Sequence, residues 1–177
     1  MILGLDISTS ITGYTILDGE AKIIKCEDWD LRNKRYFPDL YTKTSLIKLG
    51  LEEIKKEYPI AHVYIEEPFT FFRGGGSTAK TMAKLQAFNG IVSWLCCDIY
   101  GSNPVHISSA KARKLNGIKV PRGQKAKQVV LDYLLENEES FSIEYTKKGN
   151  PKPSSYDRAD SLIIAKAPQC ICILFYS

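Results

Sequence analysis

Two carboxylates stand three residues apart near the end of the chain, directly before an apolar run. They are Asp157 and Asp160, in the stretch 156–165. On a helix this spacing brings both side chains to one edge of a stripe that otherwise packs inward. Acidic residues are common at the start of a helix, where they interact favourably with its dipole. Two acids on a partly buried face also suit a cation bound between them, and a divalent metal is the simplest such cation.

Two further acids stand where apolar strands end. Asp6 follows the first apolar run of the chain, and Glu66 follows a later one. An acid at such a place is costly to bury unless it is paired or coordinates a metal. If the two strands are neighbours, these acids end side by side, and a helix across that edge would add Asp157 and Asp160. The resulting set of oxygen ligands suits magnesium or manganese, whereas each acid alone also fits a turn or a helix cap.

The elements that must position these acids are strand-rich at the start of the chain and helical later. Strands are expected over residues 1–7, 13–17, 22–29, 61–65 and 103–107, and long helices over 40–58 and 77–100. The Asp18-Gly19 pair predicts a two-residue hairpin between the second and third strands. Two shorter helices and the acidic last helix follow, and Pro168 is expected to end the last one. This order predicts an α/β fold, a mixed five-stranded sheet with helices packed on both faces.

Composition is that of an ordinary globular protein. The 177 residues predict one domain over 1–167, and the apolar segment 168–177 fits an edge strand, a continued helix or a partner surface. Charged residues make up 25% and hydrophobic residues 44%, and the net charge of +4 is compatible with a polyanionic partner. The five cysteines lack the histidine spacing of a zinc site, so we expect reduced thiols and an intracellular location. Neither a leader nor a bilayer-spanning run is expected.

Short motifs from the first strand to the last helix form an ordered series over nearly the whole chain. They read Ile2-Leu-Gly-Leu-Asp6-Ile-Ser8, Thr12-Gly13-Tyr14, Tyr64-Ile65-Glu66 with Phe69 downstream, Lys84-Leu-Gln86-Ala87, and Asp157-Arg-Ala-Asp160-Ser-Leu. This series resembles the RuvC family of Holliday junction resolvases, in the ribonuclease H-like nuclease superfamily. The first motif is common in that superfamily, whereas the last motif combined with the middle acid is more specific.

The resemblance implies a fold, a reaction and a set of ligands. The fold would be the ribonuclease H-like mixed sheet, in a homodimer that resolves four-way DNA junctions by symmetric nicks in two strands. The implied metal ligands, by position, are Asp6, Glu66, Asp157 and Asp160. Two Mg²⁺ or Mn²⁺ ions per site would activate water and stabilise the leaving oxygen. No nucleotide cofactor or membrane partner is expected, and a bacterial or phage origin fits a compact resolvase.

Two positions in this carried-over pattern have alternatives. Glu67 would replace Glu66 as the middle acid if the strand register slipped by one residue. The family also carries a catalytic lysine at the start of the helix after the basic loop. Lys127 is favoured for that role, and Lys125 is the alternative.

Basic and aromatic side chains flank the predicted site. A surface that binds the DNA backbone needs cations without sequence readout, and exposed aromatic rings stack on bases. The candidates for DNA contact are Phe71, Phe72, Arg73, Lys80, Lys111, Arg113, Lys114, Lys119, Arg122 and Lys125. A solvated basic surface explains the cations equally well, and core packing is the alternative for the two phenylalanines. The long helix 77–100 is the candidate dimer surface, and Trp94 within it is expected in the core.

Three other functions share parts of this pattern. A nuclease of the same superfamily acting on other branched DNA or on RNA would need the same acids. An ATP-binding phosphotransferase of the actin and sugar-kinase type has a similar first hairpin. Such a protein, however, needs a second domain and a second glycine-rich phosphate loop, which this chain lacks. A junction-binding protein without catalysis is disfavoured, because the acid set is intact.

Overall fold

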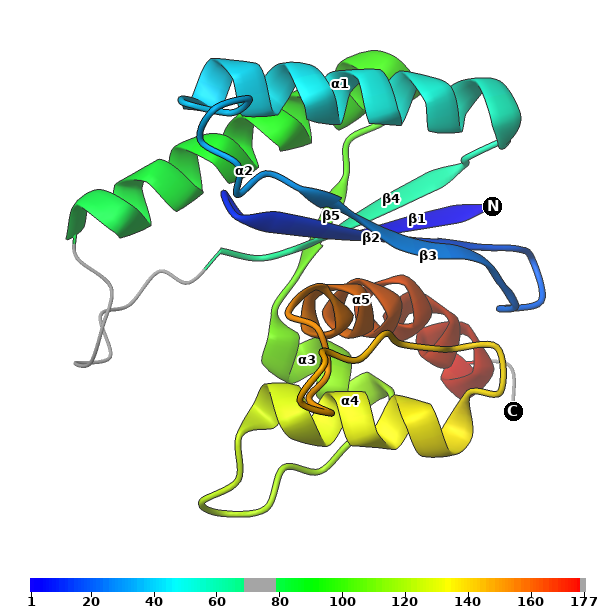
Figure 1. Ribbon diagram of the computed structural model, residues 1–177. Coiled ribbons are helices and arrows are strands. Elements are labelled where there is room, and N and C mark those ends of the chain that lie inside the picture. Colours follow the sequence, from blue (N-terminus) through cyan, green and yellow to red (C-terminus); the bar gives the residue numbers. More distant parts are fainter. Residues whose placement is uncertain (69–78, 176–177) are drawn as a thin grey trace.

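The computed structural model describes residues 1–68 and 79–175, with side chains up to residue 168. Its centre is a five-stranded sheet with the order β3-β2-β1-β4-β5 (Figure 1). The strands are β1 (Ile2–Asp6), β2 (Ile11–Leu17), β3 (Ile23–Asp30), β4 (His62–Glu66) and β5 (Val105–Ile107). The first three are antiparallel, whereas β4 runs parallel to β1 and β5 parallel to β4. The predicted mixed five-stranded sheet is therefore confirmed.

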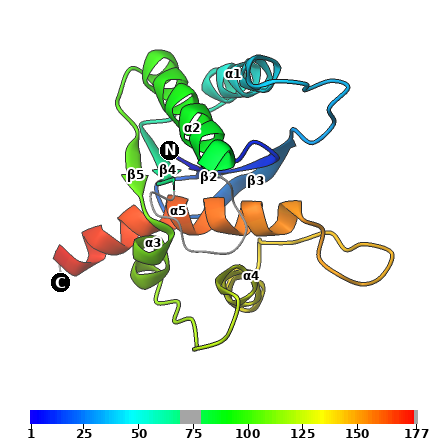
Figure 2. The same cartoon turned by 90° about the vertical axis from the view of Figure 1, so that its left-hand side faces the viewer.

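Helices lie on both sides of this sheet (Figures 1 and 2). They are α1 (Leu40–Glu57), α2 (Ala79–Tyr100), α3 (Ser109–Leu115), α4 (Ala126–Asn137) and α5 (Ser154–Phe175). The first two cover one face and the last three lie on the other, with α5 directly against the strands. Each side buries its own hydrophobic cluster, so the sheet separates two cores.

Alternation along the two central strands decides which residues meet which helices. Leu3 and Leu5 of β1, with Val63 and Ile65 of β4, pack in the cluster beneath α1 and α2. Because neighbouring side chains on a strand point to opposite faces, the residues between and after them face α5. Both strands therefore present their final acid to the α5 side.

Two glycines let α5 lie directly on the sheet. A Cβ atom added to Gly4 would lie 2.6 Å from the carbonyl oxygen of Ser161. One added to Gly13 would lie 2.1 Å from the carbonyl oxygen of Asp157. Both distances are far below van der Waals contact, so any side chain here would push the helix away from the sheet. The small residues thus bring the acid-bearing turns of α5 to the ends of β1 and β2.

The connection between β2 and β3 corrects the predicted two-residue hairpin. It occupies residues 18–22, and the carboxylate of Asp18 accepts hydrogen bonds from the N–H groups of Glu20 (2.8 Å) and Lys22 (2.9 Å). The left-handed residue is Ala21, with φ of 68°, instead of Gly19. The Asp18 side chain organises this longer turn, a role that an Asp-Gly pair does not distinguish from a tight hairpin.

The last helix corrects a second prediction, because it continues through Pro168 to Phe175. Of the alternatives for this part of the chain, the structure therefore has the continued helix. A proline inside a helix removes one backbone hydrogen bond and crowds the preceding turn. The turns before Pro168 are anchored, however, because residues from Ala159 to Ala167 are almost all buried against the sheet and neighbouring helices.

Trp94 is a third correction, since 63% of its surface is exposed on α2 and it is not a core residue. The helical repeat of α2 is otherwise as predicted, with Phe88, Val92 and Leu95 buried. In the described part of the chain, no helix combines the length and hydropathy needed to cross a membrane.

Candidate active site

Asp6 and Glu66 reach the same edge of the sheet because β1 and β4 are parallel neighbours. The ladder pairs Leu5 with Ile65, so the next residue of each strand is an acid at the shared end. Leu5 and Ile65 point toward α1 and α2, and the acids therefore turn toward α5. Parallel pairing and strand alternation together bring two carboxylates to one place.

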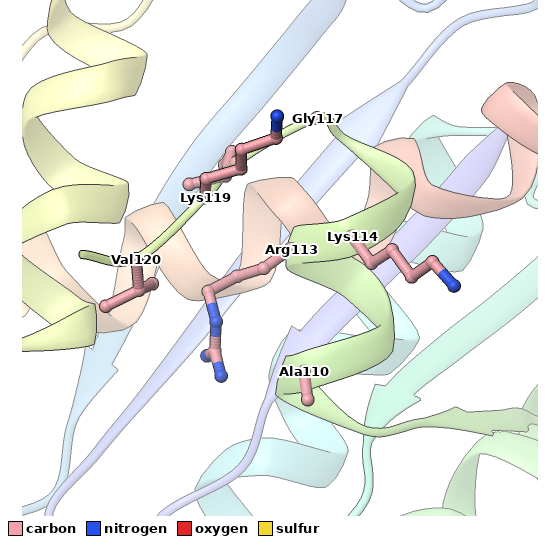
Figure 3. Close-up of a pocket in the computed structure, with 7 residues that line it drawn as sticks. Ala110, Arg113, Lys114, Gly117, Lys119 and Val120 are labelled. Carbon is pink, nitrogen blue, oxygen red and sulfur yellow. The ribbon is translucent and has the colours of Figure 1, made fainter. Parts of the chain in front are cut away.

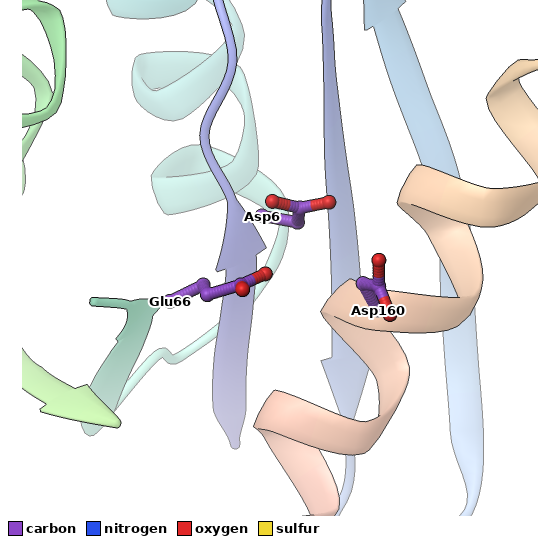
Figure 4. Close-up of side chains that lie close together, drawn as sticks. All are labelled: Asp6, Glu66 and Asp160. Carbon is purple, nitrogen blue, oxygen red and sulfur yellow. The ribbon is translucent and has the colours of Figure 1, made fainter. Parts of the chain in front are cut away.

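Asp160 of α5 completes a cluster of three acids (Figure 4). One carboxylate oxygen from each of Asp6, Glu66 and Asp160 lies within 4.8 Å of the other two. Asp6 and Asp160 are buried, and Glu66 is half-buried. Glu67, the alternative middle acid, is exposed and lies outside the cluster. Asp157 is also outside this set of three, although it lies one turn before Asp160 on the same helix.

Lys127 reaches three acids of the predicted set from the start of α4. Its Nζ lies 3.0 Å from Asp160, 3.2 Å from Asp157 and 3.8 Å from Asp6. The start of α4 is held beside α5 by the Tyr156 hydroxyl, which donates to the Gln128 side chain at 2.8 Å.

Lys125 is the N-cap residue of α4, and within the described chain it forms no ion pair with these acids. Of the two predicted lysines, Lys127 is therefore the one that the structure brings to the carboxylates.

Burial has the largest effect on the pKa values of the buried acids. Burial, followed by the charges of Glu66 and Asp160, raises the pKa of Asp6 well above its ordinary value, and Lys127 only partly opposes this. Burial likewise raises the pKa of Asp160 to about 6, against the lowering effect of Lys127. The pKa of Asp157 is also raised by burial.

Lys127 responds in the complementary direction. Partial loss of hydration disfavours its charged form, although 58% of its side chain is exposed. Asp6, Asp160 and Asp157 together outweigh that effect and raise its pKa above the ordinary value. The ammonium group is therefore firmly charged. One monovalent cation nevertheless faces several carboxylates, so the site retains excess negative charge.

The donor set fits a divalent cation. Asp6 Oδ2 is buried and accepts no hydrogen bond, and the Lys127 ammonium group is 3.8 Å away, too far to donate one. Such an oxygen is costly to bury unless a cation contacts it more closely. The converging side chains offer only oxygen atoms, the ligands preferred by magnesium and manganese. Asp6, Glu66 and Asp160 are placed to hold such an ion, and Asp157 lies beside them.

Glu66 has two supporting contacts that the sequence analysis did not predict. The Ser109 hydroxyl donates to Glu66 Oε1, and the buried Asn89 side chain donates to the Glu66 carbonyl oxygen at 3.2 Å. Both contacts join segments that are distant in the sequence, so local patterns do not predict them. The position of Ser109 just after a predicted strand is the one signal that points to the edge of the sheet where the acids lie.

The predicted DNA-contact residues divide into described and undescribed ones. Phe71, Phe72 and Arg73 lie outside the described residues. The exposed cations of the set are Lys80, Lys111, Lys114, Lys119, Arg122 and Lys125, and Arg113 is partly buried. Among the described residues, none of these cations forms an ion pair with Asp6, Asp157 or Asp160, which pair with Lys127.

Three of these cations border a hollow of about 290 Å³ between α3 and the loop that follows it. Arg113, Lys114 and Lys119 line it, but their charged ends point in different directions (Figure 3). Such divergence suits an extended polyanion better than one enclosed anion.

A known protein is similar to this chain over nearly its whole length. A curated relative, the crossover junction endodeoxyribonuclease RuvC of Clostridioides difficile, is 28% identical over 167 residues, which are 93% of this chain and 87% of the relative. The chain is thus similar to a RuvC resolvase over nearly its whole length. No family model matches this chain.

Solved structures agree on the fold. T. thermophilus RuvC, determined in complex with Holliday junction substrate, has a TM-score of 0.66 at 16% identity and covers 98% of this chain and 94% of its own. The yeast mitochondrial Holliday junction resolvase has a TM-score of 0.63 at 14% identity, covering 99% of this chain and 80% of its own. The ribonuclease H-like arrangement predicted for this chain is thus confirmed.

Proposed function

We propose that this protein is a divalent-metal-dependent endodeoxyribonuclease that resolves four-way DNA junctions. The observation that carries the proposal is the convergence of Asp6, Glu66 and Asp160 from three separate elements beside Lys127. Similarity to a curated RuvC resolvase supports the junction as substrate, and the structurally similar T. thermophilus RuvC was solved with such a junction. The localisation that suits this function is with the DNA inside the cell.

The proposed chemistry is hydrolysis of a phosphodiester bond. Asp6, Glu66, Asp157 and Asp160 would hold Mg²⁺ or Mn²⁺, two ions per site. When bound, these ions supply an activated water and neutralise charge on the phosphate and leaving oxygen. Lys127 would keep a fixed positive charge beside the scissile phosphate, because its own pKa is raised by the acids around it.

DNA would lie across the α3 and α4 side of the site. Lys111, Lys114, Lys119 and Arg122 are exposed there, in segments that begin beside Glu66 and end beside Lys127. Their divergent charges suit contact with successive phosphates and carry no sequence readout. Stacking of Phe71 or Phe72 at the junction centre stays a prediction.

Paired nicking requires two copies of the site, and α2 offers a surface for a homodimer. Ile91 and Trp94 are 37% and 63% exposed and share one helix face with Gly90, which has open space around it. Gly90 lies beside Trp94 on this face, and a residue without a side chain allows close helix approach. We expect a dimer in sedimentation at micromolar concentration and a monomer for Trp94→Glu, and a monomeric wild type would contradict paired nicking.

The test of the proposed function is cleavage of a labelled mobile four-way junction, beside duplex and single-stranded controls, with Mg²⁺, Mn²⁺ or EDTA. Paired, metal-dependent nicks confined to the junction are expected. Equal cutting of every substrate would keep the nuclease and reject junction selectivity, as for a superfamily nuclease with another substrate. Tight binding without cutting in any metal would instead indicate a junction-binding protein.

A further inference from the structure

Adjacent serines at the start of α3 have different partners. The Ser108 hydroxyl is the N-cap of the helix and accepts from the Lys111 N–H at 3.4 Å. The Ser109 hydroxyl turns away from the helix and donates to Glu66 Oε1. One serine therefore satisfies its own helix, whereas the next reaches a carboxylate of the candidate metal site.

The sheet register explains why Ser109 arrives there. β4 and β5 are parallel, and Glu66 pairs with Ile107 at their shared end. The Glu67 N–H also donates to the Ile107 carbonyl oxygen at 3.0 Å, which continues the pairing by one residue. The chain then turns directly into α3, so Ser109 leaves the strand end beside the Glu66 side chain.

Glu66 needs such support more than the other two acids of the cluster. Asp6 and Asp160 have short side chains, and both residues are buried. Glu66 is longer by one rotatable bond and only half-buried, so packing alone restricts it less. Asn89 fixes its backbone through the carbonyl oxygen, and this leaves the carboxylate to Ser109.

We infer that Ser109 is a positioning residue for the metal site: its hydroxyl holds Glu66 in the rotamer whose carboxylate faces Asp6 and Asp160. The inference rests on the metal site of the proposed function. Contacts that orient a ligand in this way change metal affinity by roughly 10–100-fold in other proteins. Ser109 also connects Glu66 with the helix that carries Lys111 and Lys114, so a phosphate bound there would stabilise the same arrangement.

The test compares Ser109→Ala with Ser108→Ala in a titration of Mn²⁺ followed by electron paramagnetic resonance, on the full chain without DNA. Ser109→Ala should weaken Mn²⁺ binding roughly tenfold and leave the thermal unfolding midpoint unchanged, because alanine suits the first turn of a helix. Ser108→Ala should show the reverse, a lower midpoint from the lost cap with unchanged Mn²⁺ affinity. Ser109→Thr keeps the hydroxyl and should restore most of the affinity.

Each outcome has a separate meaning. Unchanged Mn²⁺ affinity in Ser109→Ala would overturn the positioning role and leave the proposed nuclease intact. Equal loss in Ser109→Ala and Ser109→Thr would also overturn it, since the hydroxyl would then not be the active group. No Mn²⁺ binding by the wild type would overturn the metal site, and the positioning role with it.

Discussion

The two faces of the sheet are both packed, but with different groups. Beneath α1 and α2 the buried cluster is made almost entirely of aliphatic and aromatic side chains, and Phe88 is the largest fully buried one described. Beneath α5 the buried residues include Asp6, Asp160 and the hydrogen-bonded pair Thr15 and Ser161. The first face gains stability from apolar burial, whereas the second also buries charged groups, which lowers stability unless they are paired.

This contrast indicates that one face of the sheet mainly stabilises the fold, whereas the other carries the groups proposed to act in the reaction. Apolar contacts on the α1 and α2 side fix β1 and β4 in register, and that register positions the acids on the other side. Variants on the first face should therefore change unfolding with little effect on the reaction, and variants at the acids should do the opposite.

Asp6→Asn is expected to have the largest effect, and it tests whether the acids serve the reaction and not stability. Cleavage should fall by roughly a thousandfold or more, because a ligand at the centre of the cluster is lost. Stability of the metal-free protein should hold or increase, since burial and neighbouring acids disfavour the charged form of Asp6. Single-turnover cleavage and urea unfolding measure the two effects. Glu67→Gln, an exposed neighbour of the cluster, is the control, and equal loss of junction binding in Asp6→Asn would contradict the ligand role.

Phe88→Ala tests the opposite face. Removal of this fully buried ring should lower the free energy of unfolding by about 3–5 kcal/mol, through lost burial and a cavity. Cleavage well below the melting temperature should stay near the wild-type rate. Denaturant titration and cleavage at low temperature provide the comparison, with the exposed Leu49→Ala as the matched variant on the same face. A selective loss of cleavage would mean that the faces are not separable.

Lys127→Gln tests whether the positive charge of Lys127 contributes to cleavage. Loss of the charge beside the acids should reduce cleavage by about a hundredfold, as removal of one electrostatic contact does in other enzymes. Lys125→Gln should stay within a few-fold of wild type, because this residue forms no ion pair with the acids in the described chain. Rates measured over a range of Mg²⁺ concentrations would show the difference. Equal effects of the two substitutions would reject Lys127 as the catalytic lysine.

Gly13→Ala is expected to have the smallest effect, and it tests whether the close approach of α5 to the sheet matters for both stability and cleavage. Gly13→Ala should cost about 1–3 kcal/mol of stability, because its Cβ would meet the Asp157 carbonyl oxygen at 2.1 Å and push α5 outward. Cleavage should fall together with stability, since Asp157 and Asp160 move with the helix. Gly19→Ala has open space and is the control. Thermal unfolding and cleavage on the same preparations test this, and an unchanged cleavage rate would show that α5 tolerates the shift.

Much of the site could be predicted because local patterns determine it. Asp6 and Glu66 end apolar strands, and parallel pairing of those strands needs only alternation and register to bring them together. Asp160 follows from helical spacing on a helix that must cover the same sheet face.

What the sequence did not predict depends on contacts between distant segments. Pro168 lies within a helix that is anchored by the sheet. Trp94 is the exception, because the spacing of the buried residues of α2 already places it on the outer face of that helix. The partner of Ser109 is a carboxylate 43 positions earlier in the chain. Local propensity carries no information about such partners.

The crossing of α5 over β1 also has a consequence for protein synthesis. Asp6 is among the earliest of these acids to be translated, and Asp160 follows only after all five strands have been made. A nascent or truncated chain that lacks α5 has half of the carboxylates and leaves one face of its sheet uncovered. Under the proposed function, we therefore expect that a chain cuts DNA only after its last helix has docked on the sheet.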